Sequence, residues 1–407
     1  MNKFILDILF LSLISFVSCS DDSVFTKKDY ILYNGEIVIT SIPDIEEVTV
    51  PRTLKVRGNT YDVTGIGALA GSYKKNLKIL SLPPSINTIG ENAFIGTSIE
   101  KLYIEDLSSW CDIDFKYRET YGNTGIQYAS DASPFAYGGT TRLYLENEVV
   151  ETLVIPENVD EIRPFAFQSI DCRNLIIGNS VVEVGPHAFH VSKIEELNMG
   201  KSLQVIEREA FSYCKRLKKI TLSDNLKRLT DYVFAGCDSI NEINSPSLET
   251  ICYLKVGRTN GAVFGYGIHT LLINGESLNE VVIPFVEASL GDYCLGHTDN
   301  IVSIKCEEGI ESTGFLSFRK NNSLEEIIFP STMKKILTDF SGCSKLRNIF
   351  LKSIEPPMIN GSYWDPGRYI PNCVLYVPAE SIDAYKSSPD WGLFKKILPL
   401  EEDLPAN

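Results

Sequence analysis

Leu217-Lys218-Lys219-Ile220-Thr221-Leu222 carries the pattern that decides the fold of this 407-residue chain: apolar residues at the first, fourth and sixth positions, with other residues between them. The alternation at its end is typical of a short strand with one buried face. The pattern L-x-x-L-x-L occurs eleven times, and within uninterrupted runs the copies are 22 or 23 residues apart. The copies run from Leu77 to Leu82, from Ile99 to Ile104, up to Ile155, up to Ile177, and then from Ile194 to Met199, Leu217 to Leu222, Ile240 to Ser245, Leu278 to Ile283, Ile301 to Cys306, Leu324 to Phe329 and Leu346 to Leu351.

A second motif runs in phase with the first. It joins an Ile-Gly type pair to Ala-Phe, and its clear copies are Ile89 to Phe94, Val184 to Phe189 and Ile206 to Phe211. Looser copies end at Leu69, Phe167, Phe234, Leu295, Phe318 and Phe340. Two phased motifs at this period predict a β-rich leucine-rich-repeat solenoid of about eleven units, with short strands on one face and irregular return limbs whose Ala-Phe pairs fill the interior.

The pairing of Ile-Gly-x-x-Ala-Phe with L-x-x-I-x-I-Pro resembles the BspA-like leucine-rich-repeat family of bacterial surface proteins, over most of residues 24–400. The resemblance implies an N-terminal β cap over residues 24–65, a solenoid over 66–372 and a closing unit over 373–407. Caps are also needed on physical grounds, because a bare terminal repeat exposes apolar surface and a strand edge.

Residues 1–18 are predicted to be a signal peptide, with Lys3 followed by a short apolar stretch from Phe4 to Val17. The segment ending in Ser18-Cys19 resembles a lipobox with Phe at its first position, so Cys19 is the expected lipid-attachment residue and 19–23 a tether. Ordinary cleavage with Cys19 unmodified is the alternative. The Ser-Asp-Asp that follows resembles the signal of Bacteroides-type surface lipoproteins, which implies an outer-membrane protein exposed on the cell surface and bound to the membrane only through its lipid.

Two stretches interrupt the period, residues 105–149 and 246–277, and each adds about one repeat's length of chain. Such insertions often carry the individual function of a repeat protein. The first could equally be an irregular repeat. Its tyrosines are candidates for stacking on a sugar: Tyr117, Tyr121, Tyr128 and Tyr137.

Catalytic and metal-binding motifs are missing from the sequence, so we expect no enzyme, cofactor or metal. The chain has four histidines but no H-E-x-x-H, and His187, which is three residues before His190, falls at a variable repeat position expected at the surface. Of the ten cysteines, three lie three residues after the aromatic residue that ends the second motif: Cys214, Cys237 and Cys343. They are expected to be small buried residues of the repeat. A net charge of −15 argues against nucleic-acid partners.

Within each strand motif, the residue before the last core position should face outward by the two-residue period of a strand. This mixed, rather apolar column is the candidate binding face, unless a loop or cap covers it; its selected members are Tyr103, Ile176, Asn198, Thr221, Lys305, Ile328 and Phe350. The sequence therefore favours a monomeric, non-catalytic adhesin that binds host or bacterial surface proteins, as the family resemblance implies. A glycan-capturing surface lipoprotein is the alternative.

Overall fold

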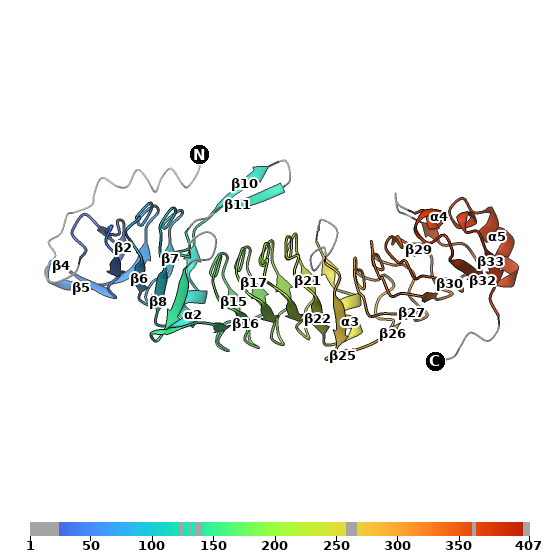
Figure 1. Cartoon of the computed structure of the whole chain (residues 1–407). Coiled ribbons are helices and arrows are strands. Elements are labelled where there is room, and N and C mark those ends of the chain that lie inside the picture. The colour runs from blue at the N-terminus through green and yellow to red at the C-terminus, as the bar shows by residue number, and fades with distance from the viewer. Residues whose placement is uncertain are drawn as a thin grey trace. The chain divides into compact units, whose positions relative to one another are not determined.

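The computed structural model describes residues 24–122, 125–129, 132–135, 141–257, 267–359 and 364–401. The chain divides into two units, residues 1–175 with 184–194 and residues 176–183 with 195–407. Figure 1 shows the repeated turns in each, and the fold is a β-solenoid of about 14 turns with a spacing of about 23 residues. The turns outnumber the eleven strand motifs because strands of the insertions and the chain ends also complete turns.

The first unit begins with hairpins and continues with parallel ladders. Strands β1 and β2 pair antiparallel, as do β4 and β5, while β2 pairs parallel with β5. One sheet follows the order β1-β2-β5-β7-β9, with β4 on β5, and a second follows β13-β12-β8-β6-β3. The elements are β1 (Tyr30–Tyr33), β2 (Glu36–Ile39), β3 (Glu47–Thr49), β4 (Thr53–Val56), β5 (Asn59–Ile66), β6 (Ile79–Leu82), β7 (Thr88–Ile89), β8 (Lys101–Ile104), α2 (Leu107–Cys111), β9 (Asp114–Phe115), β10 (Arg118–Gly122), β11 (Gly125–Ala129), β12 (Arg142–Leu145), β13 (Glu148–Val149), β14 (Thr152–Val154) and β15 (Glu161–Ile162).

Strands β16 (Asn174–Ile176) and β17 (Glu183–Val184) contain the residues at which the two units meet in the sequence. In the second unit, the strand motifs form the ladders β18-β20-β22-β24-β25 and β26-β27-β28-β30-β32-β33. Its elements are β18 (Glu196–Asn198), β19 (Val205–Ile206), β20 (Lys219–Thr221), β21 (Arg228–Leu229), β22 (Glu242–Ser245), α3 (Leu248–Cys252), β23 (Lys255–Val256), β24 (Thr270–Ile273), β25 (Glu276–Ser277), β26 (Glu280–Ile283), β27 (Ser303–Cys306), β28 (Glu326–Phe329), β29 (Lys335–Ile336), β30 (Asn348–Leu351), β31 (Met358–Ile359), α4 (Pro366–Tyr369), β32 (Val374–Val377), η2 (Ala379–Ser381), α5 (Ile382–Ser387), η3 (Trp391–Leu393) and β33 (Ile397–Pro399).

The return limbs are more regular than their sequence indicates. The residues that end at the Ile of the Ile-Gly motif form two-residue strands, and these make a second parallel ladder, as in β19-β21-β23. The glycine that follows lies against the preceding turn: a Cβ on Gly90 would be 2.3 Å from the backbone nitrogen of Ala68. The Ile-Gly pair therefore ends one ladder strand and lets the turns approach closely.

In most of the described return limbs, the plug, which is the Ala-Phe pair of the second motif, is flanked by residues in the left-handed conformation. Glu209 precedes Ala210-Phe211 with φ +55°, and Tyr213 follows the plug with φ +58°. Phe211 is fully buried. One plug assignment from the sequence is wrong: Leu69 takes φ +60° and is 55% exposed, because it occupies the position that Glu209 has in its own turn. Ala70 is the buried residue of that turn.

The two insertions share one structural plan. Each begins with a capped five-residue helix, α2 after β8 and α3 after β22. Each then returns a strand to the ladder it left, because β12 pairs parallel with β8 and β24 pairs parallel with β22. A short antiparallel strand, β13 or β25, then closes the edge of that ladder. Both insertions are thus irregular turns of the solenoid.

The C-terminal residues cover the last ladder with aromatic side chains. Tyr385 and Trp391 are fully buried, and their rings are 5.9 Å apart. The Trp391 indole nitrogen donates to the carbonyl oxygen of Pro357 at 2.8 Å. In the described part of the chain, no helix combines the length and the apolar character needed to cross a membrane.

Candidate functional site

Two tyrosines stack on the outward face of the first unit's ladder. Tyr103 on β8 is in register with Tyr144 on β12, and their ring centroids are 4.7 Å apart with an interplanar angle of 27°. On its other side, Tyr103 is in register with Ser81 of β6, which in turn is next to Thr49 of β3. One face of the Tyr103 ring is therefore against Tyr144, and small side chains lie on the opposite side.

These small side chains lie beside a hollow of about 460 Å³ at the carboxyl ends of β3, β6, β8 and β12. Its volume falls within the range of small-ligand pockets. The lining combines apolar, hydroxyl, amide and carboxylate groups: Thr49, Val50, Ser81, Leu82, Pro83, Tyr103, Ile104, Glu105, Glu146 and Asn147.

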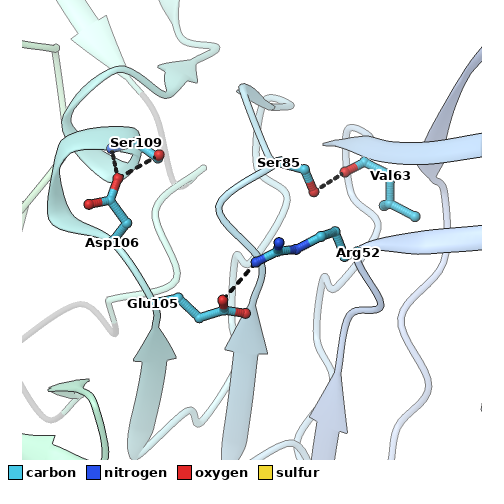
Figure 2. Close-up of polar contacts among 6 residues, drawn as sticks. All are labelled: Arg52, Val63, Ser85, Glu105, Asp106 and Ser109. Atoms are coloured by element: carbon cyan, nitrogen blue, oxygen red, sulfur yellow. Dashed lines mark hydrogen bonds and ion pairs between the residues drawn. The ribbon is translucent and has the colours of Figure 1, made fainter.

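The charges around the hollow are largely paired. Figure 2 shows the Arg52 guanidinium donating to the carboxylate of Glu105, at 2.8 Å. Since β6 lies between β3 and β8, this ion pair crosses the carboxyl end of β6. The Lys101 ammonium lies 5.8 Å from the centroid of the Tyr144 ring. The Glu105 carboxylate is therefore paired with a cation, and Glu146 supplies a second carboxylate to the lining.

A tight turn carries Glu146 and Asn147 to the rim. Both have positive φ, +51° and +67°, and they join Leu145 to Glu148 in the β12-β13 hairpin. Two consecutive positive φ angles in a two-residue hairpin loop are characteristic of the type I′ turn. The rim is thus a short and stiff loop.

The start of α2 fixes the chain directly after Glu105. The Asp106 carboxylate accepts hydrogen bonds from the backbone nitrogen and the hydroxyl of Ser109, at 2.7 and 2.6 Å (Figure 2). The hydroxyl and backbone hydrogen bonds from Ser109 lower the pKa of Asp106. Trp110 holds the helix in place, because its indole nitrogen donates to the carbonyl oxygen of Ala166 at 2.9 Å. The helix is therefore fixed in position directly after Glu105, the residue that lines the hollow.

The described part of the second insertion repeats the plan with a different outward pair. Its outward pair is Asn244 and Leu272, and the amide oxygen of Asn244 accepts from the backbone nitrogen of Gly275 at 2.8 Å. The Tyr103–Tyr144 pair therefore distinguishes the first insertion from the described part of the second. Sequence reasoning found Tyr103 and missed Tyr144, which lies in an insertion without a phased motif; the alternation Leu143-Tyr144-Leu145 was the available signal.

The other candidate residues lie in the second unit. Ile176 is 40% exposed, Asn198 is exposed, and Thr221 is half-buried and in register with Asn198. Lys305 and Phe350 are also half-buried, and Phe350 stacks on Tyr376 with centroids 4.8 Å apart. None of these residues belongs to the hollow.

Ile328 departs from the expected exposure, since only 8% of it is accessible. Its register neighbours are Lys305 on β27 and Phe350 on β30. The long side chains of these two neighbours cover Ile328, which lies between them on the sheet face.

Of the remaining tyrosine candidates, Tyr117 packs against Phe165 with ring centroids 5.2 Å apart. Tyr121 and Tyr128 lie on β10 and β11. Tyr137 and Cys19 lie outside the described residues.

A family profile described as the BspA type leucine rich repeat region matches the chain in six copies, over residues 52–120, 143–254 and 271–358. These ranges cover more than half of the chain. The chain belongs to the BspA-type leucine-rich-repeat family. No curated protein matches it.

Solved structures of leucine-rich-repeat proteins are similar to the chain at low identity. A leucine-rich cell surface protein from Faecalibacterium prausnitzii is 16% identical with a TM-score of 0.45, over 94% of this chain and 96% of that one. A leucine-rich-repeat protein from Bacteroides ovatus is 16% identical with a TM-score of 0.44, over 96% and 99%. The pneumococcal vaccine antigen PcpA is 15% identical with a TM-score of 0.38, over 92% and 97%.

The cysteines belong to the core of the BspA-type repeats. All nine that the structure describes are buried. The Cys237 thiol donates to the carbonyl oxygen of Phe211 at 3.0 Å, and the Cys343 thiol donates to that of Phe318 at 3.1 Å. Each therefore contacts the plug residue of an earlier turn. Burial raises the pKa of Cys343 to about 12, which keeps the thiol protonated and poorly nucleophilic.

Three of the four histidines, His187, His269 and His297, are also buried, and His190 is half-buried. The expectation of a surface position for His187 is therefore wrong. His187 is 6% exposed and its ring stacks on Phe165 with centroids 5.1 Å apart. The His187 ring is covered by Phe165, which holds the same position in the preceding turn. Burial lowers the pKa of His269 to about 3 and that of His190 to about 4.

Proposed function

We propose that the chain is a surface-anchored, non-catalytic recognition protein that binds host or cell-surface macromolecules through the outward faces of its parallel ladders. The observation that carries this proposal is the hollow beside Tyr103, where a stacked aromatic pair, hydroxyls and carboxylates meet on an exposed sheet face. Membership of the BspA-type family supports it, because solenoid surfaces of this kind recognise partners over an extended area.

The composition of the hollow favours binding over catalysis. Among the residues that the structure describes, its lining contains no histidine, cysteine or lysine, and the carboxylate of Glu105 is already paired with Arg52. A general acid and base would need groups that can exchange protons with a substrate. The hollow instead offers hydrogen-bonding groups and the face of the Tyr103 ring, which can hold a partner without reacting with it.

Binding of the purified full-length chain to immobilised matrix proteins and to a glycan array tests this proposal. We expect saturable binding in at least one of the two formats, and no turnover of the bound partner. Absence of binding in both formats would contradict the recognition role. Hydrolysis of a screened substrate that disappears in a Glu146→Gln variant would contradict the non-catalytic part.

The anchor requires its own experiment. We propose that Cys19 carries the lipid that holds the chain on the outer membrane, facing outward. In cells, Cys19→Ala should move most of the protein from the membrane fraction to the soluble fractions, because acyl chains supply the membrane affinity of such a chain. Ser20→Ala, one residue further on, is the matched control and should leave the distribution unchanged. Equal membrane association of both variants would rule out the anchor.

A further inference from the structure

We infer that the hollow at the carboxyl ends of β3, β6, β8 and β12 binds an uncharged oligosaccharide, with one sugar ring against Tyr103. This inference rests on the proposed recognition function and names the ligand class of one site within it. The stacking candidates chosen from the sequence were other tyrosines of the insertion, whereas the residues that carry this site are Tyr103, Ser81, Glu105 and the turn of Glu146 and Asn147.

The aromatic platform has one free side. Tyr144 stacks on one face of the Tyr103 ring. The neighbours on the opposite side, Ser81 and then Thr49, have short side chains that do not cover the ring. That side of Tyr103 lines the hollow. The face of an aromatic ring carries partial negative charge and attracts the weakly positive C–H groups of a flat partner. Pyranose rings present such a C–H face. Stacking on Tyr144 also holds the Tyr103 ring in place before a ligand arrives.

The polar groups of the hollow suit hydroxyls. The Ser81 and Thr49 hydroxyls can donate and accept, the amide of Asn147 does both, and the carboxylate of Glu146 accepts. A sugar offers alternating donors and acceptors around its ring, so each of these groups finds a counterpart. Hydrogen-bond donors and acceptors placed around the stacking ring would fix the orientation of a bound sugar.

The charge balance favours an uncharged ligand. The Arg52 guanidinium pairs with the Glu105 carboxylate, and both side chains are exposed, at 59% and 61%. A basic peptide would have to displace Arg52 to reach Glu105. An acidic glycan would meet Glu146 on the rim and the net charge of −15 of the whole chain. A neutral sugar avoids both costs.

The test begins with an array of neutral and acidic glycans, probed with the purified full-length chain, followed by titration calorimetry with the best neutral oligosaccharide. Tyr103→Ala should weaken binding by about tenfold or more, equivalent to about 1.4 kcal/mol. Tyr103→Phe keeps the ring and should bind nearly as well as the parent. Tyr33→Ala is the control, because Tyr33 is 68% exposed on β1 and does not line the hollow.

A second variant addresses the rim without disturbing the turn. Asn147→Gly tolerates the positive φ of this position and removes the whole side chain with its amide, so it should also weaken binding. Neutral-glycan binding that survives both Tyr103→Ala and Asn147→Gly would place the ligand elsewhere and overturn this inference. Binding to matrix proteins without any binding to neutral glycans would overturn it as well, but would leave the proposed recognition function intact.

Discussion

Replacing Phe211 by alanine is expected to lower the free energy of unfolding of the second unit by about 3 to 5 kcal/mol. The Phe211 ring is fully buried and stacks on Phe234 of the next turn, with centroids 5.5 Å apart and an interplanar angle of 12°. Alanine leaves a cavity that stiff ladders on both sides cannot close. The backbone carbonyl that accepts from Cys237 remains, so the loss reports packing alone.

Urea unfolding followed by circular dichroism measures the effect, and Phe315→Ala is the matched control. Phe315 is 42% exposed in the same unit, so its truncation should cost far less. Because each turn contacts only its neighbours, hydrogen exchange in Phe211→Ala should speed up most in the adjacent turns. Equal losses for the two variants would mean that the plug residues do not carry the core.

The repeat could be predicted from the sequence because its core positions are set by local rules. The alternation in Leu217–Leu222 matches a strand face, and Ile206 and Phe211 hold the same positions in their turn as Ile89 and Phe94 do in theirs. The wrong assignment at Leu69 arose where the plug is reduced to Ala70-Gly71. Gly71 leaves that space to Phe94, whose ring would be 2.9 Å from a Cβ at Gly71.

The candidate site was only partly predictable, since its geometry depends on pairing across an insertion. Tyr103 followed from the outward column, but its partner Tyr144 depends on β12 rejoining the ladder after an interruption of more than thirty residues. Burial of Ile328 depends on the lengths of both neighbours in the column, which a single strand does not show. His187 was misplaced because its burial depends on a neighbouring turn, where Phe165 presents a ring on which the imidazole stacks.

Gly314→Ala is expected to destabilise the second unit by about 3 kcal/mol or more, at or above the upper end for overpacking. A Cβ at this position would be 2.1 Å from the carbonyl oxygen of Gly291 and 2.7 Å from the backbone nitrogen of Asp292. All of these atoms belong to the backbone of the preceding turn, so no rotamer change relieves the clash. The turns must separate, which also weakens the hydrogen bond from the Phe315 backbone nitrogen to Asp292, 2.7 Å long.

Gly367→Ala is the control for this substitution, because the nearest atom to a Cβ there is a carboxylate oxygen of Asp365 at 3.4 Å. Position 367 lies in α4, where alanine is the better helix former, so the control should be neutral or slightly stabilising. Urea midpoints of the two variants therefore separate close backbone approach from the general effect of adding a methyl group. If Gly314→Ala unfolds with the same midpoint as the parent, the spacing between turns is set by the apolar plugs, and the glycine of the Ile-Gly motif only ends its strand.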